Sequence, residues 1–300
     1  MLLLALLVAA GPASAQRDLV RAVTWQGVER RYVLHLPGDD VPERAPLVVA
    51  LAGLGQPLEE LRTWLPIEPV AMQHGFVVVY PEAIERRWSY WPGGGVQLPG
   101  RGAEEVDDVG FISALVKELV AKGIADPLRL YVTGVSRGAL MTWTLACERS
   151  ELFAAVAPLS SPMIAPQVEA CRPSRAIPVI AVASTADPVQ PYDGVIQLPP
   201  LPRLVSIPES MSYWWRRHGR TAETVEQLPH LHADDPSRVE RHEWTGCAQG
   251  GPVVLYRVNG GDHQPPSFAR DPALGQHNRD METAAVLWNA FSSITLRKAP

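Results

Sequence analysis

The feature that most constrains the fold is a serine flanked by glycines between two apolar segments. Gly134-Val135-Ser136-Arg137-Gly138 follows the strand-like run at 130–133 and precedes the helix-like run at 139–146. Glycines two positions before and after a serine fit a sharp strand-to-helix turn, which exposes the hydroxyl at the start of the helix. A capping serine in an ordinary glycine-rich turn would look similar, but the apolar runs on both sides favour a nucleophile at Ser136.

Continuous apolar runs elsewhere predict further buried strands, and the segments between them have helical spacing. The runs cover residues 46–52, 76–80, 153–158, 177–183 and 253–258, and the helical patterns cover 57–74, 109–122, 208–219 and 280–291. Alternating residues at 19–25 and 31–36 predict an antiparallel hairpin around Gly27. The sequence therefore predicts an α/β fold with a mostly parallel central sheet, helices on both faces, and reactive side chains at the carboxyl ends of the strands.

Three of these strand ends carry the side chains of a catalytic triad. Ser136, Asp187 and His263 each follow a separate predicted strand. The order Ser, Asp, His along the chain is the one that an α/β-hydrolase requires. His263 would take the proton of Ser136 during attack on an acyl carbon, and Asp187 would hold the imidazole in the required tautomer.

Other acidic and histidine residues are weaker candidates. Asp193 lies in a turn-like sequence and His277 lies beyond a proline-rich loop, so they are the alternatives for the acid and the base. His230 and His232, with the aspartates at 234–235, superficially suggest metal ligands. Their setting between proline and polar residues, without helical spacing, favours a solvated loop.

The stabilisation of an oxyanion needs fixed donors beside the serine. The backbone N–H of Arg137 is one candidate, and the second is near Leu54, in the loop after the strand at 46–52. Trp88 and Trp91 lie in the long segment 81–106, where they either line a substrate cleft or pack the segment onto the body. Two aspartates at 107–108 are expected to cap the helix that follows.

The ends and the composition suggest an exported protein. Residues 1–15 contain a short apolar core and a small-x-small end, which predicts a secretory signal cut after Ala15. Residues 16–300 then form a single catalytic domain, secreted or periplasmic, without a membrane span. A net charge of −5 without a basic block argues against nucleic acid as a partner.

Cysteines and cofactor motifs complete the sequence predictions. Cys147 ends the helix after Ser136, and Cys171 lies in the loop before the next strand, so these two are expected to form a disulfide. Cys247 is left without an evident partner. No phosphate loop, pair of histidines on a helix or dinucleotide fingerprint is present, so we expect neither a cofactor nor a metal.

The motifs around these residues resemble the secreted polyhydroxybutyrate depolymerase and feruloyl (carbohydrate) esterase group of the α/β-hydrolase superfamily. The resemblance rests on segments 51–56, 107–111, 131–138, 146–158, 186–192 and 260–263. It implies hydrolysis of carboxylic esters outside the cell, on polyester or on hydroxycinnamoyl or acyl polysaccharide. Ala52 and Gln264 differ from the residues that are usual in the group, which has histidine and threonine there.

We therefore expect a monomeric or weakly associated serine esterase. Three alternatives remain at this point: a peptidase or a polyketide-type acyl-ester hydrolase that uses the same triad, and a catalytically altered hydrolase fold that serves as a binding protein.

Overall fold

The computed structural model describes residues 17–38, 41–91, 105–195, 202–246, 250–268 and 278–296. The strands in these ranges are β1 Arg17–Trp25, β2 Val28–Leu36, β3 Ala45–Leu51, β4 Val77–Pro81, β5 Ala125–Val135, β6 Ala155–Leu159, β7 Val179–Ser184, β8 Arg220–Gln227, β9 Arg238–Gly246 and β10 Val253–Asn259. The helices are α1 Leu58–Trp64, α2 Ile67–His74, α3 Asp108–Ala121, α4 Arg137–Glu148, α5 Ala165–Ala170, α6 Ile207–Arg217 and α7 Thr283–Ser292, with a 3-10 turn η1 at Ile84–Arg86.

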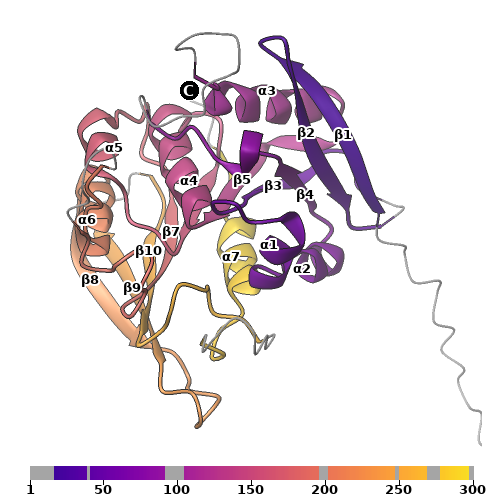
Figure 1. Ribbon diagram of the computed structural model, residues 1–300. Helices are drawn as coiled ribbons and strands as arrows, with labels where there is room; N and C mark the ends of the chain where they lie inside the picture. The colour runs from indigo at the N-terminus through magenta and orange to yellow at the C-terminus, as the bar shows by residue number, and fades with distance from the viewer. Residues whose placement is uncertain are drawn as a thin grey trace, which may run out of the picture.

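The strands form one ten-stranded sheet with the order β1-β2-β4-β3-β5-β6-β7-β10-β9-β8 (Figure 1). The six strands from β4 to β10 in this order run parallel to their neighbours. Antiparallel pairs flank them: β1 with β2 on one side and β9 with β8 on the other. The predicted α/β class and the predicted hairpin around Gly27 are confirmed, and the residue at the turn has a φ of 74°.

Helices cover both faces of the sheet, as expected for parallel strands that are buried on both sides. On one face, the core includes side chains of α3, α4 and α6, such as Phe111, Trp143 and Trp214. On the other face, it includes side chains of α1, α2 and α7, such as Leu61, Ala71 and Trp288. The strand residues between these layers are almost completely buried, so the sheet is a rigid platform for the loops at its carboxyl edge.

Two parts of the fold differ from the sequence prediction. The helical pattern at 57–74 is two helices, α1 and α2, because Pro66 has no N–H to donate and pushes Leu65 out of the helical region, to φ −134° and ψ 82°. The pair β8 and β9 was not predicted. The described side chains of β8 are exposed on both faces, so its sequence has no apolar alternation to reveal a strand.

A buried ion pair fixes the segment that follows β4. Arg30 on β2 pairs with Asp108 at the start of α3 at 2.5 Å, and the exposed fractions of the two side chains are 2% and 0%. The second carboxylate oxygen of Asp108 accepts a hydrogen bond from the Ser89 N–H at 2.7 Å. Burial raises the pKa of Asp108, and the Arg30 charge opposes that rise. Asp107 caps α3 through the Gly110 N–H, so the predicted capping is confirmed for Asp107, whereas Asp108 is an ion-pair partner.

The predicted disulfide is confirmed: Cys147 at the end of α4 is bonded to Cys171 just after α5. Cys247 and the proposed signal at 1–15 lie outside the described residues. Within the described ranges, none of the helices has the length and apolar character needed to cross a bilayer.

Candidate active site

Ser136 lies at the end of β5, in a backbone conformation that is unusual for a residue with a side chain. Its φ is 56° and its ψ is −116°, and its N–H donates to the Leu159 carbonyl on β6 at 2.9 Å. The flanking glycines are required by close approach. A Cβ at Gly134 would lie 2.4 Å from the Gly138 carbonyl oxygen, and one at Gly138 would lie 2.1 Å from the Leu51 carbonyl oxygen. The turn is therefore a strained strand-to-helix elbow at the carboxyl edge of the sheet.

Asp187 and His263, which are far apart in the sequence, are in direct contact. His263 Nδ1 lies 2.7 Å from Asp187 Oδ2. The other carboxylate oxygen of Asp187 accepts hydrogen bonds from the Val189 and Gln190 N–H groups, each at 2.8 Å. Asp187 is only 6% exposed, so its carboxylate has a fixed orientation toward the imidazole. This contact brings together two of the three predicted triad residues.

The third predicted residue, Ser136, makes no side-chain hydrogen bond to any described residue, and its pairing with His263 stays a prediction. Catalytic hydrogen bonds are often loose in a free enzyme and shorten when substrate binds. Asp193 and His277 were the alternatives to Asp187 and His263. Asp193 is exposed in its turn, and His277 lies outside the described residues.

An aromatic residue that the sequence did not single out packs against His263. The Trp64 ring, at the end of α1, lies with its centroid 5.9 Å from the imidazole centroid, and the two ring planes meet at 84°. Trp64 belongs to the predicted helix at 57–74, and helical spacing does not indicate which residue of a helix faces a distant loop. The α1 helix thus forms one wall beside the imidazole.

The loop after β3 is held in place by four hydrogen bonds. Within the loop, the Gly53 N–H donates to Gln56 Oε1 at 2.8 Å, and the Gln56 N–H donates to the Gly53 carbonyl at 3.3 Å. From outside it, Trp88 Nε1 donates to the Ala52 carbonyl at 2.8 Å, and the Arg86 carbonyl accepts from the Gly55 N–H at 2.9 Å.

This loop lies directly against the serine. A Cβ at Gly53 would be 3.4 Å from Ser136 Cβ. Among the described residues, neither the Leu54 N–H nor the Arg137 N–H has an acceptor in the protein. These two N–H groups are therefore without a protein acceptor among the described residues, and their role as donors to an oxyanion stays a prediction.

The two tryptophans predicted to bind substrate occupy different places. Trp88 is 1% exposed and hydrogen-bonded to the loop after β3, so it packs its segment onto the body of the protein. Trp91 is half-buried and packs against the core near Cys147 and Cys171. Trp88 also borders a cavity of about 190 Å³ behind the loop after β3, to which Gly53 and Gln56 contribute.

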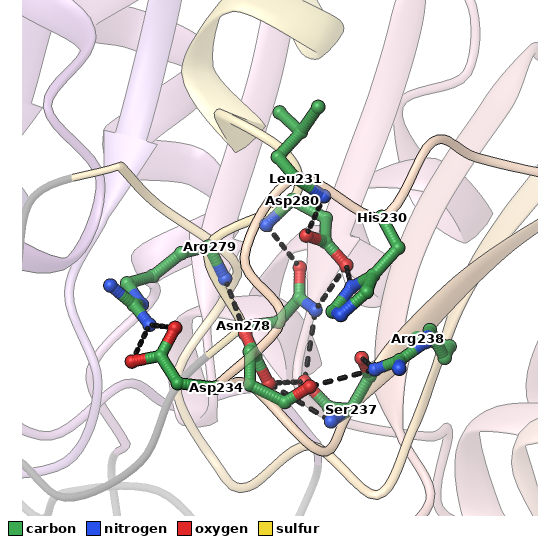
Figure 2. Close-up of polar contacts among 9 residues, drawn as sticks. His230, Leu231, Asp234, Ser237, Arg238, Asn278, Arg279 and Asp280 are labelled. Carbon is green, nitrogen blue, oxygen red and sulfur yellow. Dashed lines mark hydrogen bonds and ion pairs between the residues drawn. The ribbon is translucent and has the colours of Figure 1, made fainter.

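The segment with His230 is a loop whose residues 229–234 are exposed or partly exposed, as expected, but His230 itself takes part in a polar network (Figure 2). His230 Nδ1 lies 2.9 Å from Asp280 Oδ2, and the Leu231 N–H donates to the same carboxylate at 2.7 Å. Asn278 Nδ2 donates to Ser237 Oγ at 2.9 Å. The sequence did not reveal the network because Asp280 and its neighbours, 48 to 50 residues later in the chain, supply the partners.

The network also reaches the loop that carries His263. The Ser267 N–H donates to the Asn278 carbonyl at 3.0 Å, and Asp235, which is 6% exposed, accepts from the Arg279 N–H at 3.0 Å. These bonds tie the segments before β9 and before α7 to the loop after β10. The network therefore holds Ser267, four residues after His263 in the same loop.

One cluster in the described ranges has the composition of a metal site, but an arginine side chain contacts both of its carboxylates. Oxygens of Asp18 and Glu68 lie near His35 Nδ1, and Arg62 contacts each of the two carboxylates at 2.7 Å. Burial acts to raise the pKa of Asp18, yet hydrogen bonds from His35 and Arg62 lower it. Burial and the charge of Glu68 raise the pKa of the neighbouring Tyr80 well above its usual range. The cluster ties β1 to α1 and α2.

The fold is of the α/β-hydrolase type, and the sequence shows the family. Over residues 30–209, more than half of the chain, the sequence matches the family described as esterase PHB depolymerase, and the chain belongs to that family. The fold resembles that of an acetyl xylan esterase from Aspergillus awamori, with a TM-score of 0.55 and 16% identity over 82% of this chain and 94% of that one.

Relatives with known names agree with this membership. A protein named as an esterase, NocK, from Nocardia uniformis subsp. tsuyamanensis is 30% identical over 91% of this chain and 82% of its own length. Feruloyl esterase B from Piromyces equi is 27% identical over 64% of this chain, which spans only 34% of that protein. Poly(3-hydroxyalkanoate) depolymerase C from Paucimonas lemoignei is 34% identical over 42% of this chain and 30% of its own length. The protein is thus a hydrolase of carboxylic ester bonds.

Proposed function

We propose that the protein is a serine esterase in which Ser136, His263 and Asp187 form the catalytic triad. The observation that carries the proposal is the 2.7 Å contact between His263 Nδ1 and Asp187 Oδ2 at the edge of the sheet where the strained Ser136 lies. A carboxylate on Nδ1 fixes the tautomer whose Nε2 is free to accept a proton, which is the role of a general base toward a serine hydroxyl.

In the proposed reaction, His263 Nε2 takes the proton of Ser136 as Oγ attacks the carbonyl carbon of the ester. The negative charge that develops on the carbonyl oxygen is stabilised by the Leu54 and Arg137 N–H groups. His263 then gives the proton to the oxygen of the departing alcohol, which leaves an acyl group on Ser136. Water, activated by the same imidazole, hydrolyses this acyl-enzyme.

The proposal extends to substrate and location. The names of the relatives support esters of polyhydroxyalkanoate or of hydroxycinnamoyl or acyl polysaccharide as substrates. The disulfide supports an oxidising compartment, because disulfides are rare in the cytosol, so the protein is secreted or periplasmic after loss of residues 1–15. Residues 16–300 act as one catalytic domain, and the protein is monomeric.

The nucleophile is tested with a matched pair of variants. Ser136→Ala abolishes hydrolysis of p-nitrophenyl acetate and labelling by a fluorophosphonate, because the attacking oxygen is gone. Ser160→Ala is the control, since Ser160 also follows a strand and has a φ of 54° but lies outside the elbow. Labelling that persists in Ser136→Ala would place the nucleophile elsewhere. If the wild-type protein is labelled but does not hydrolyse esters, the binding protein is favoured. If the wild-type protein hydrolyses peptide anilides instead of esters, the peptidase is favoured.

A further inference from the structure

Trp64 packs against the imidazole of His263 in a geometry that restricts how the imidazole can turn. The two ring centroids are 5.9 Å apart, and the ring planes meet at 84°. Aromatic pairs prefer such an edge-to-face arrangement at centroid distances of about 4.5–7 Å, because the positive edge of one ring meets the negative face of the other. The contact is therefore directional, and it favours one orientation of the imidazole over others.

The imidazole of His263 needs a second support, because its hydrogen bond acts at one end of the ring only. Asp187 Oδ2 lies 2.7 Å from Nδ1, and it is the one hydrogen-bond partner that the ring has among the residues that the structure describes. This bond fixes the position of Nδ1, but the χ2 torsion of a histidine has broad wells, so the ring can still tilt about the contact. The tilt decides where Nε2 points, and Nε2 is the atom that must reach the Ser136 hydroxyl.

The end of α1, which carries Trp64, is anchored well enough to provide that support. Leu61 and Leu65, which precede and follow Trp64 in the sequence, are each 1% exposed. Arg62 contacts two carboxylates at 2.7 Å each, one on β1 and the other on α2. The helix ends at Trp64 because Pro66 prevents its continuation. Apolar and charged contacts thus fix the last turn of α1 against its neighbours.

The aromatic ring of Trp64, and not its N–H group, accounts for its place in the structure. Trp64 is half-buried against the core on this face of the sheet. Its Nε1 atom is buried without an acceptor in the described part of the chain, so no hydrogen bond there explains the choice of an indole. Phenylalanine at this position would keep an aromatic ring and leave no polar group unsatisfied, whereas leucine would keep an apolar side chain but lose the ring.

We propose that Trp64 is a positioning residue of the esterase, which holds the imidazole of His263 at the tilt that directs Nε2 to Ser136 Oγ. The proposal rests on the proposed function, since it takes His263 as the general base. Trp64 acts through the imidazole and not on the ester, so its removal lowers kcat and leaves KM nearly unchanged. The segment from Leu54 to Trp64 then serves the site at both ends, with a backbone donor before α1 and an aromatic support at its last residue.

The test compares Trp64→Leu with Trp64→Phe in the hydrolysis of p-nitrophenyl acetate. Trp64→Leu removes the aromatic contact, and we expect kcat to fall by ~10-fold, the upper end of what an edge-to-face pair contributes, with KM within about 2-fold. Trp64→Phe keeps a ring beside the imidazole and should retain about a third of kcat or more. Trp215→Leu is the matched control, because Trp215 is also half-buried near the end of a helix but packs on the opposite face of the sheet.

Proton NMR spectra of the same variants separate positioning from a general loss of structure. The proton in the hydrogen bond between His263 Nδ1 and Asp187 gives a low-field signal when the bond is well ordered. We expect this signal in the wild-type protein, Trp64→Phe and Trp215→Leu, and its broadening or loss in Trp64→Leu, because a ring that tilts exchanges the proton with water more quickly.

Three kinetic results would overturn the role of Trp64. They are an unchanged kcat in Trp64→Leu, a raised KM at constant kcat in that variant, and a loss of kcat in Trp64→Phe or Trp215→Leu as large as in Trp64→Leu. No turnover of any ester by the wild-type protein would instead refute the proposed function.

Discussion

Trp88 offers the sharpest test of how the site is held together. Its indole N–H donates to the Ala52 carbonyl at 2.8 Å, and Ala52 begins the loop that contains the Leu54 N–H. Trp88→Phe keeps an aromatic ring at a position that is 1% exposed but removes this donor. If Trp88 positions the oxyanion loop, the variant should lose turnover rate more than substrate affinity.

The magnitude follows from the single hydrogen bond. Removal of one partner of a buried hydrogen bond costs about 1–3 kcal/mol. A free energy of 1.4 kcal/mol corresponds to a factor of ten in rate. If the whole ~1–3 kcal/mol is lost from the stabilisation of the transition state, kcat falls by about 5- to 150-fold. Complete loss of an oxyanion donor lowers kcat by ~10²–10³-fold, which is the upper bound for a loop that moves but remains present. We expect a fall of ~10-fold or more.

The assay is steady-state hydrolysis of p-nitrophenyl acetate, with kcat and KM determined separately. Trp214→Phe is the matched control, because Trp214 is fully buried on α6 and its indole N–H donates to no described residue. Both variants lose the same atoms from the core, but only Trp88→Phe releases the loop. An unchanged kcat with a raised KM in Trp88→Phe would show that Trp88 contacts substrate and would refute the positioning role.

Two further predictions concern stability. Replacement of Cys147 and Cys171 by alanine lowers the free energy of unfolding by about 3 kcal/mol, as expected for a loop of 24 residues, and an unchanged urea midpoint would contradict this. Burial acts to raise the pKa of Asp280, but hydrogen bonds from His230, the Leu231 N–H and Asn278 lower it. Because the folded pKa is below the unfolded value of about 3.9, the carboxylate stabilises the fold above that pH and loses this effect as the pH falls through the folded pKa. Asp280→Asn should therefore lower stability by ~1 kcal/mol at pH 6, with a smaller difference from wild type near pH 2, measured by urea titration at both pH values.

The sequence predicted the elements whose pattern is local. Neighbouring residues alone determine three of these features, so the local sequence was enough to predict them: the Ser136 elbow, the central strands and the helix cap at Asp107. The pairing of Cys147 with Cys171 followed from the two elements that carry them. The contact between Asp187 and His263 followed from a fold rule, since both residues come shortly after strands that end at the same edge.

Contacts between distant segments could not be predicted in the same way. The packing of Trp64 against His263 and the hydrogen bond from Trp88 to Ala52 depend on how helices and loops pack in three dimensions. The local sequence pattern does not indicate this packing. The same holds for His230, whose partner Asp280 is 50 residues away. The hairpin of β8 and β9 was missed because β8 has no apolar alternation, and its described side chains are exposed on both faces.

The pair Arg30–Asp108 has a consequence for the order in which the protein folds. It joins residues 78 positions apart, and through Ser89 it anchors the segment from which Trp88 reaches the loop after β3. Contacts between residues so far apart in the chain form late, because a long loop must close before they bring any gain. We therefore expect the loop after β3 to reach its final position only after the β1–β2 hairpin and α3 have docked, which makes the loop beside Ser136 one of the last parts of the protein to form.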